Sequence, residues 1–113
     1  MSERNEDERK EIRKDFREAV NMSPQELEDW LATDEAWSVG QGEGESKGHE
    51  MGRRIVALRR KSVEDMDKDD HDAMQKVTGY VHRHLKQGGP SKDVEHSKWR
   101  YSLMNWGHDP LKD

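Results

Sequence analysis

The chain has 113 residues, which suits one domain, and 40% of its residues are charged while 29% are hydrophobic. It contains no cysteine, which excludes disulfides, thiolate metal sites and a thiol nucleophile. No apolar run approaches the length of a membrane span, and the charged N-terminus does not resemble a signal peptide. We therefore expect no membrane partner and a cytoplasmic location.

The supply of core residues is small. Leu, Ile, Val and Phe together number 16, a level at which disorder must be considered. However, the net charge is only −5, and four Trp and six Met add large apolar side chains. These counts predict a folded domain with a thin core.

The first ten residues, MSERNEDERK, hold no apolar side chain after Met1. We expect residues 1–10 to form a charged tail or a frayed helix start, and residues 11–113 to form a single helical domain. A helix is predicted from Glu11 because apolar residues recur there at helical spacing, at Ile12, Phe16, Ala19 and Val20.

A strong helix-start signal follows at Ser23. Ser23 and Glu26 form a capping box, and Pro24 occupies the first helical position. Met22 and Leu27 stand where a hydrophobic staple would pack. The spacing predicts a helix that ends near Thr33, after which Thr33 caps a further short turn.

Residues 40–50, GQGEGESKGHE, contain four Gly and predict a flexible loop. The favoured interpretation is a linker between two helices. Gly-rich segments can also bind phosphate through backbone N–H groups. However, no strand precedes this segment, no Gly-Lys-Ser/Thr follows it, and Glu43 and Glu45 inside it oppose an anion.

Three more helices are expected after the loop. One runs from about Glu50 to Lys61, a second is capped by Asp67 and ends at Gly88, and a third runs from Ser91 to about Trp106. The last carries more apolar residues than one stripe needs, so we expect it to be the central packing element. With no strand alternation in the sequence, the prediction is an all-α, single-domain bundle of about five helices.

Charge is segregated along the chain. Residues 1–35 carry a net charge of −6, whereas residues 51–61 carry +5 and residues 73–92 carry +4, both without an acid. Two interpretations follow: a phosphate-facing surface, or basic helices that neutralise the acidic first helices within one fold. Under the first, the candidate nucleic-acid-binding residues are Lys47, Arg53, Arg54, Arg59, Arg60, Lys61, Arg83 and Lys86.

Metal binding and catalysis find little support. His82 and His84 point about 200° apart on a helix, and the acidic run 67–72 lacks the Gly and terminal Glu of an EF-hand loop. No nucleophile stands beside a local base, and the carboxylates lie in surface-like runs. We expect no catalytic residues, no metal and no other cofactor. The aromatic residues Trp99, Tyr101 and Trp106 are predicted mainly as core, with base stacking as the alternative.

Four stretches resemble a family of small proteins known only as a domain of unknown function. They are residues 22–40, Gly52-Arg53-Arg54-Ile55-Val56, Gly79-Tyr80-Val81-His82-Arg83-His84-Leu85 and, most specifically, Trp99-Arg100-Tyr101-Ser102-Leu103-Met104-Asn105-Trp106-Gly107-His108-Asp109-Pro110. The resemblance covers roughly residues 14–112. Members are sometimes labelled DNA-binding proteins, and no catalytic residues are assigned in the family.

A looser resemblance covers residues 24–61. A helix with Glu26-Leu27-x-x-Trp30-Leu31, a loop with Ser46-x-Gly48 and a helix that opens Gly52-Arg53-Arg54 are similar to the helix–extended-loop–helix modules of the SAP type. Those modules bind DNA, and the resemblance implies phosphate contacts from Lys47, Arg53 and Arg54. The loop here is longer and more acidic than in that class.

The sequence therefore favours a non-enzymatic nucleic-acid-binding protein, with DNA as the expected partner. The alternative is a protein-interaction adaptor or a homodimeric module. A contiguous basic face would favour nucleic acid, whereas basic helices covered by acidic ones would favour the adaptor.

Overall fold

The computed structural model describes residues 4–39 and 46–112. Within these ranges the chain forms six α-helices and no strand, which confirms the predicted all-α class. The additional helix is α3, which the sequence predicted only as a short turn. The elements are α1 (Glu6–Ala19), α2 (Pro24–Leu31), α3 (Asp34–Ser38), α4 (Lys47–Arg60), the 3₁₀ turn η1 (Val63–Asp65), α5 (Lys68–Gln87), the 3₁₀ turn η2 (Val94–His96) and α6 (Lys98–Asn105).

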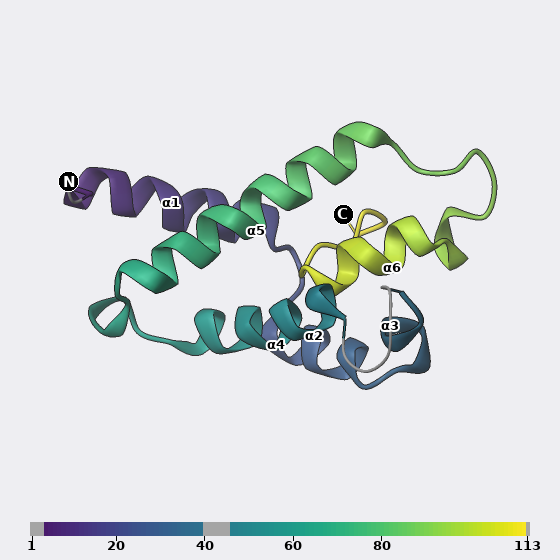
Figure 1. Cartoon of the computed structure of the whole chain (residues 1–113), viewed down its shortest axis with the longest axis horizontal. Helices are drawn as coiled ribbons and strands as arrows, with labels where there is room; N and C mark the ends of the chain where they lie inside the picture. Colours follow the sequence, from purple (N-terminus) through teal and green to yellow (C-terminus); the bar gives the residue numbers. More distant parts are fainter. Residues whose placement is uncertain (1–3, 40–45, 113) are drawn as a thin grey trace.

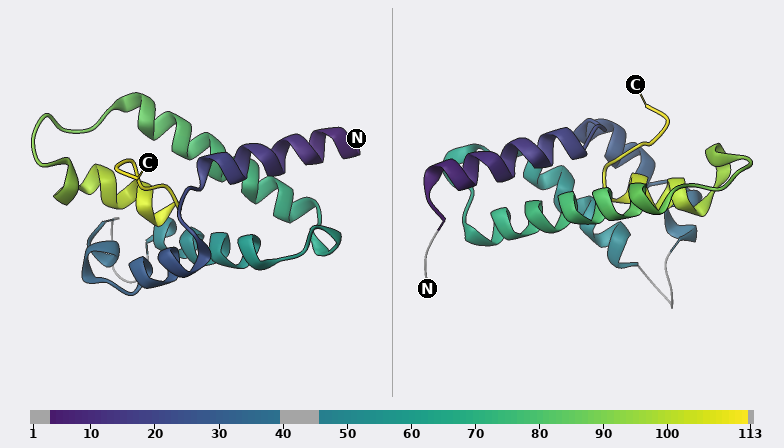
Figure 2. Two further views of the ribbon diagram at one scale, coloured as in Figure 1. Left: turned by 180° about the vertical axis from the view of Figure 1, so that it is seen from behind. Right: turned by 90° about the horizontal axis from the view of Figure 1, so that it is seen from above.

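The helices form two pairs with α6 between them. In Figures 1 and 2, α1 lies alongside α5 and α2 lies alongside α4, while α6 fits between the pairs and contacts α2, α3, α4 and α5. One continuous core joins both pairs, and its most deeply buried aliphatic side chains include Leu27, Ile55, Met74, Val77, Val81 and Leu103. No helix in the described part is long and apolar enough to cross a membrane.

Helix α1 begins at Glu6, five residues earlier than predicted. Asn5 caps it by accepting a hydrogen bond of 2.8 Å from the Glu8 N–H. Acids fill the first turn, where the helix dipole favours them, and Arg13 bonds Glu6 at 2.8 Å. Residues 6–10 are therefore helical although they lack an apolar stripe, which corrects the predicted boundary between tail and helix.

Local capping signals predicted two helix starts correctly. Ser23 accepts a bond from the Glu26 N–H, and the Glu26 carboxylate accepts one from the Ser23 N–H. Asp67 and Asp70 form the same reciprocal pair at the start of α5. Thr33 also caps α3, by accepting a bond of 3.2 Å from the Ala36 N–H.

Two helix boundaries were predicted wrongly. Helix α4 begins at Lys47 under a Ser46 cap, so residues 46–50 of the predicted loop belong to a helix start, and residues 40–45 lie outside the described residues. Helix α6 begins at Lys98 under a Ser97 cap rather than at Ser91. The helix does not extend back to Ser91 because Ser97 is extended, with φ of −89° and ψ of 149°, and Asp93 is left-handed, with φ of 49°.

The end of α6 was predicted correctly at Gly107, which has φ of 83°. The Gly107 N–H bonds the Met104 carbonyl at 2.9 Å, and the His108 N–H bonds the Leu103 carbonyl at 3.0 Å. These two bonds define a Schellman motif, whose left-handed residue glycine occupies without steric cost. The chain then turns back toward α1 and α2.

Asn105 makes α6 the centre of the bundle. Its side chain is 1% exposed, accepts a bond of 2.7 Å from the Trp30 indole and donates one of 3.0 Å to the Ala36 carbonyl. One buried amide therefore joins α2, α3 and α6. This bonding and the burial of Leu103 and Trp106 confirm α6 as the expected central packing element.

The residues after α6 attach the C-terminal segment to the rest of the fold. Asp109 receives a bidentate pair of 3.0 Å bonds from Arg100, and its backbone exchanges two bonds with the Asn21 side chain. His108 contacts the Ala19 carbonyl at 2.7 Å. Most of the specific motif at residues 99–110 is thus explained by structural contacts.

Candidate nucleic-acid interface

Several predicted contact residues on α4 are bound to acids of the same chain. Lys61 bonds Asp70 at 2.7 Å, and Arg54 lies 3.7 Å from the same carboxylate while it donates to the Asp69 carbonyl. Arg60 forms an ion pair with Glu28 of α2. Neighbouring acids therefore neutralise much of the +5 charge predicted for this segment.

Arg59 has a structural role. Its guanidinium donates to the carbonyls of Val20 and Met22 at 3.2 and 3.1 Å, which satisfies acceptors in the α1–α2 connection. The side chain is only partly exposed. A phosphate could displace this guanidinium only by leaving two carbonyls without their donor.

Ionisation reinforces the pair at Asp70. Burial opposes ionisation of this carboxyl, but hydrogen bonds from Lys61 and the Asp67 backbone outweigh burial and lower the pKa of Asp70. The same bond raises the pKa of Lys61. Both groups are charged at neutral pH, and each is the main partner of the other.

The remaining predicted residues lie elsewhere. Arg53 is exposed on α4, Lys47 is exposed in its first turn, and Arg83 and Lys86 are exposed near the end of α5. Among the described residues, Lys47, Arg83 and Lys86 form no ion pair with an acid. The structure thus separates most of the predicted set into cations with carboxylate partners, at Arg54, Arg60 and Lys61, and cations without one among the described residues, at Lys47, Arg83 and Lys86.

Helix α5 carries a basic stripe, of which the predicted contact residues Arg83 and Lys86 are only a part. Lys76, Gly79, Arg83 and Lys86 are spaced three, four and three residues apart, which places them on one helix face. Lys76 is exposed and, like Arg83 and Lys86, has no acidic partner within the described ranges. We call Lys76, Arg83 and Lys86 the α5 stripe. The acid-free composition of residues 73–92 was its signal in the sequence.

The aromatic residues form a ladder beside this stripe. Trp106 and Tyr80 stack at 4.0 Å, Tyr80 and His84 at 5.3 Å, and His84 and Trp99 at 6.3 Å, all nearly parallel. The Gly89 backbone packs against the Trp99 ring, because a Cβ at Gly89 would lie only 2.7 Å from that ring. Trp106 is buried and Trp99 packs against the core, which supports the core interpretation for these two residues, whereas Tyr101 is partly exposed.

His84 is the least satisfied member of the ladder. Its Nε2 is buried and has no hydrogen-bond partner in the part of the chain that the structure describes. Burial lowers the pKa of His84. The ring is therefore predominantly neutral at pH 7 and does not add a charge to the stripe.

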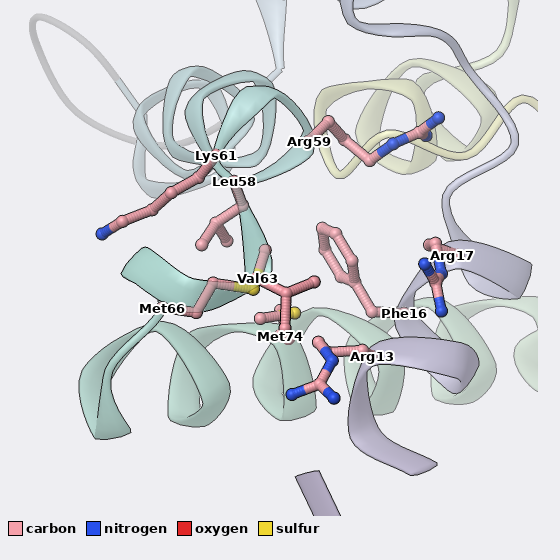
Figure 3. A pocket seen from close by; sticks show the side chains of 9 residues that line it. All are labelled: Arg13, Phe16, Arg17, Leu58, Arg59, Lys61, Val63, Met66 and Met74. Carbon is pink, nitrogen blue, oxygen red and sulfur yellow. The ribbon is translucent and has the colours of Figure 1, made fainter. Parts of the chain in front are cut away.

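Figure 3 shows a small pocket of about 90 Å³ between α1, α4, η1 and α5. Phe16, Leu58 and Met74 form an apolar centre, and the stems of four cations line the rim, those of Arg13, Arg17, Arg59 and Lys61. The charged ends of Arg59 and Lys61 point in different directions, away from this centre. Its volume lies well below the 300–1,000 Å³ of typical ligand sites.

Two larger hollows differ in charge. One of about 410 Å³ lies between α1 and α5, and its lining includes the acids Glu8, Glu11 and Asp15. The other, of about 370 Å³, lies at the start of α4 and has no acid among its described lining residues. Only the second suits an anionic ligand. The described residues contain no cluster of three potential metal ligands.

The SAP-type resemblance predicted an extended segment between two helices. Helix α3, at Asp34–Ser38, occupies part of that segment, and residues 40–45 lie outside the described ranges. The two flanking helices are present as α2 and α4. The segment before residue 40 thus departs from the pattern that the resemblance implied.

A family model described as "Protein of unknown function (DUF3140)" matches residues 15–104. The match includes α2 to α5, the C-terminal part of α1 and most of α6. No curated protein and no solved structure matches the chain.

Proposed function

We propose that this chain, which belongs to the DUF3140 family of proteins of unknown function, binds nucleic acid without catalysing a reaction. The proposed partner is DNA, and the proposed contacts are ionic bonds to backbone phosphates. The proposed contact surface is the α5 stripe together with Lys47 in the first turn of α4, rather than the basic residues at positions 53–61. The SAP-type mode of binding is not needed for this proposal.

The observation that carries the proposal is the difference between the two basic helices. On α4, Arg54, Arg60 and Lys61 already have carboxylate partners. The three cations of the α5 stripe have none within the described residues, and they extend over about 15 Å of helix. Unpaired cations attract phosphate without first losing an internal partner, and they do not hold an acid close to the DNA.

The covered aromatic ladder determines the kind of recognition. Because Tyr80 and His84 each stack on two other rings of the chain, they are poorly suited as a platform for an unpaired base. The stripe provides charge but no buried polar pocket for base edges. Binding is therefore expected to depend little on sequence and strongly on salt.

Fluorescence anisotropy with a labelled DNA duplex tests the proposal. Four phosphate contacts give a log–log salt slope of about −3 to −4, with micromolar affinity at low salt. The absence of binding at tens of micromolar protein in low salt, for duplex and for single strands, would contradict it.

A protein-binding role is the second candidate, and Trp37 favours it. Its side chain on α3 is 50% exposed and stacks on His49 at a ring distance of 4.0 Å. Exposed Trp residues often anchor protein interfaces. If this chain forms a homodimer through Trp37, its mass by light scattering should rise with concentration, and Trp37→Ala should abolish that rise. A monomer at all concentrations would exclude the homodimer.

A further inference from the structure

The hollow at the start of α4 has the composition of an anion site. Its volume is about 370 Å³, and its lining among the described residues contains one cation and no acid. The lining residues are Val39, Ser46, Lys47, Gly48, Tyr80, Ser102, Asn105 and Trp106. In Figure 1 the first turn of α4 lies against the end of α6, which brings these residues together.

Helix α4 supplies backbone donors to this hollow. The Ser46 hydroxyl accepts a bond of 3.1 Å from the His49 N–H, and its carbonyl accepts one of 2.9 Å from the Glu50 N–H. The N–H groups of Lys47 and Gly48 precede these and have no acceptor within the helix. The partial positive charge at the start of this 14-residue helix favours an anion there.

Trp106 supplies a second, independent observation. Its side chain as a whole is 5% exposed, but its indole Nε1 is not itself buried and has no hydrogen-bond partner among residues 4–39 and 46–112. Nε1 lies 2.9 Å from the position that a Cβ on Gly48 would occupy, so the donor faces the helix start. The indoles of Trp30 and Trp99, in contrast, donate to Asn105 and to the His84 carbonyl.

We propose that this hollow binds one phosphate group. The Trp106 indole, the first N–H groups of α4 and the Lys47 ammonium group are its donors. Gly48 is required because a side chain there would meet the indole nitrogen. The inference extends the proposed function, since the phosphate can belong to a small phosphate compound or to the backbone of bound DNA.

Nitrogen–proton NMR of the full chain tests the proposal, with inorganic phosphate as the probe at constant ionic strength. The Trp106 indole and Gly48 amide signals should shift and saturate, whereas the hydrogen-bonded Trp30 and Trp99 indoles should not move. Trp106→Phe identifies the indole signal, because the variant lacks that N–H. If no signal saturates at tens of millimolar phosphate, or if all four indoles shift alike, the proposal is wrong.

Two lysine variants isolate the contribution of charge at the site. Lys47→Ala should weaken phosphate binding about tenfold, because a charge-assisted bond is lost. Lys14→Ala removes the same charge from an exposed position on α1 and should leave phosphate affinity unchanged. Equal weakening by both variants would overturn the proposal, since it would indicate general attraction rather than a site.

A DNA titration identifies the source of the phosphate. If DNA shifts the Trp106 indole and competes with inorganic phosphate, the hollow binds a backbone phosphate. If phosphate saturates the site and DNA does not bind, the hollow binds small phosphate compounds. In that case the proposed DNA binding is wrong and the phosphate site stands. If DNA binds while neither probe moves the Trp106 indole, the hollow is not a phosphate site and the proposed function stands.

Discussion

At the scale of single residues, Asn105 is the most consequential contact that the sequence did not reveal. Its partners are Trp30 and Ala36, which lie 75 and 69 residues away in the chain. An Asn within an apolar helix has no local signature of such bonds. The sequence predicted the burial of the surrounding residues from their size, but not the polar group that orients them.

Asn105→Ala should lower the free energy of unfolding by about 2–4 kcal/mol, because it leaves the Trp30 N–H and the Ala36 carbonyl without partners in the core. Urea denaturation measures this change. Gln25→Ala is the matched control, since that amide is exposed and bonds only Asp29 on its own helix. The control should change stability by less than about 0.5 kcal/mol. An equal, small effect of both variants would contradict the role given to Asn105.

At the scale of elements, capping residues were predictable and helix packing was not. Ser23 was identified from a capping box and Asp67 from its residue type at a helix start, and both signals lie within a few residues of sequence. The start of α4 was misplaced because Gly48 indicates a loop. In the structure, Gly48 and Gly52 instead let α4 approach α6 closely, and this contact becomes visible only once both helices are placed.

Gly52→Ala should destabilise the protein by about 1–3 kcal/mol through overpacking. The added methyl would lie 2.6 Å from the Asn105 carbonyl and 2.8 Å from Leu31, so α4 and α6 would have to separate. Gly79→Ala on α5 is the control, because its nearest neighbour is the flexible end of Arg83 at 3.3 Å. It should be neutral or stabilise by up to about 1 kcal/mol. Thermal unfolding compares the two, and a stabilising Gly52→Ala would refute the close contact.

At the scale of the whole molecule, the sequence predicted segregated charge but not its pairing. Residues 51–61 are basic in isolation, yet Arg60 pairs with Glu28 and Arg54 with Asp70 across the fold. This partly fulfils the alternative interpretation, in which basic helices neutralise acidic ones. Within residues 73–92, the cations on α5 stay exposed. Which of the two basic segments is paired with acids depends on tertiary structure, which the sequence alone does not show.

The paired carboxylates predict how stability depends on pH. Burial would raise the pKa of Asp109, but bonds from Arg100 and the Leu111 N–H outweigh burial and lower it. Bonds from Lys112 and Ser23 lower the pKa of Glu26 to about 2. A lowered pKa in the folded state means that stability is complete above the unfolded pKa, near pH 4–4.5, and is lost as pH falls below it.

Urea midpoints from pH 7 to pH 3 measure this dependence. The midpoint should fall steeply below pH 4.5. Asp109→Asn should be less stable than the parent at pH 7, and its curve should converge with that of the parent toward pH 3, because protonation removes the same charge from the parent. Parallel curves over the whole range would show that the charge of Asp109 does not contribute.

The most direct test of the proposed function compares two charge reversals on a DNA duplex. Arg83→Glu with Lys86→Glu should weaken binding at least tenfold and reduce the salt slope by about 2, because two phosphate contacts are lost. Arg53→Glu with Arg54→Glu makes the same change in net charge on α4 and should leave the salt slope nearly unchanged. If the α4 variant loses binding while the α5 variant keeps its affinity and slope, the assignment of the DNA contacts to α5 is wrong.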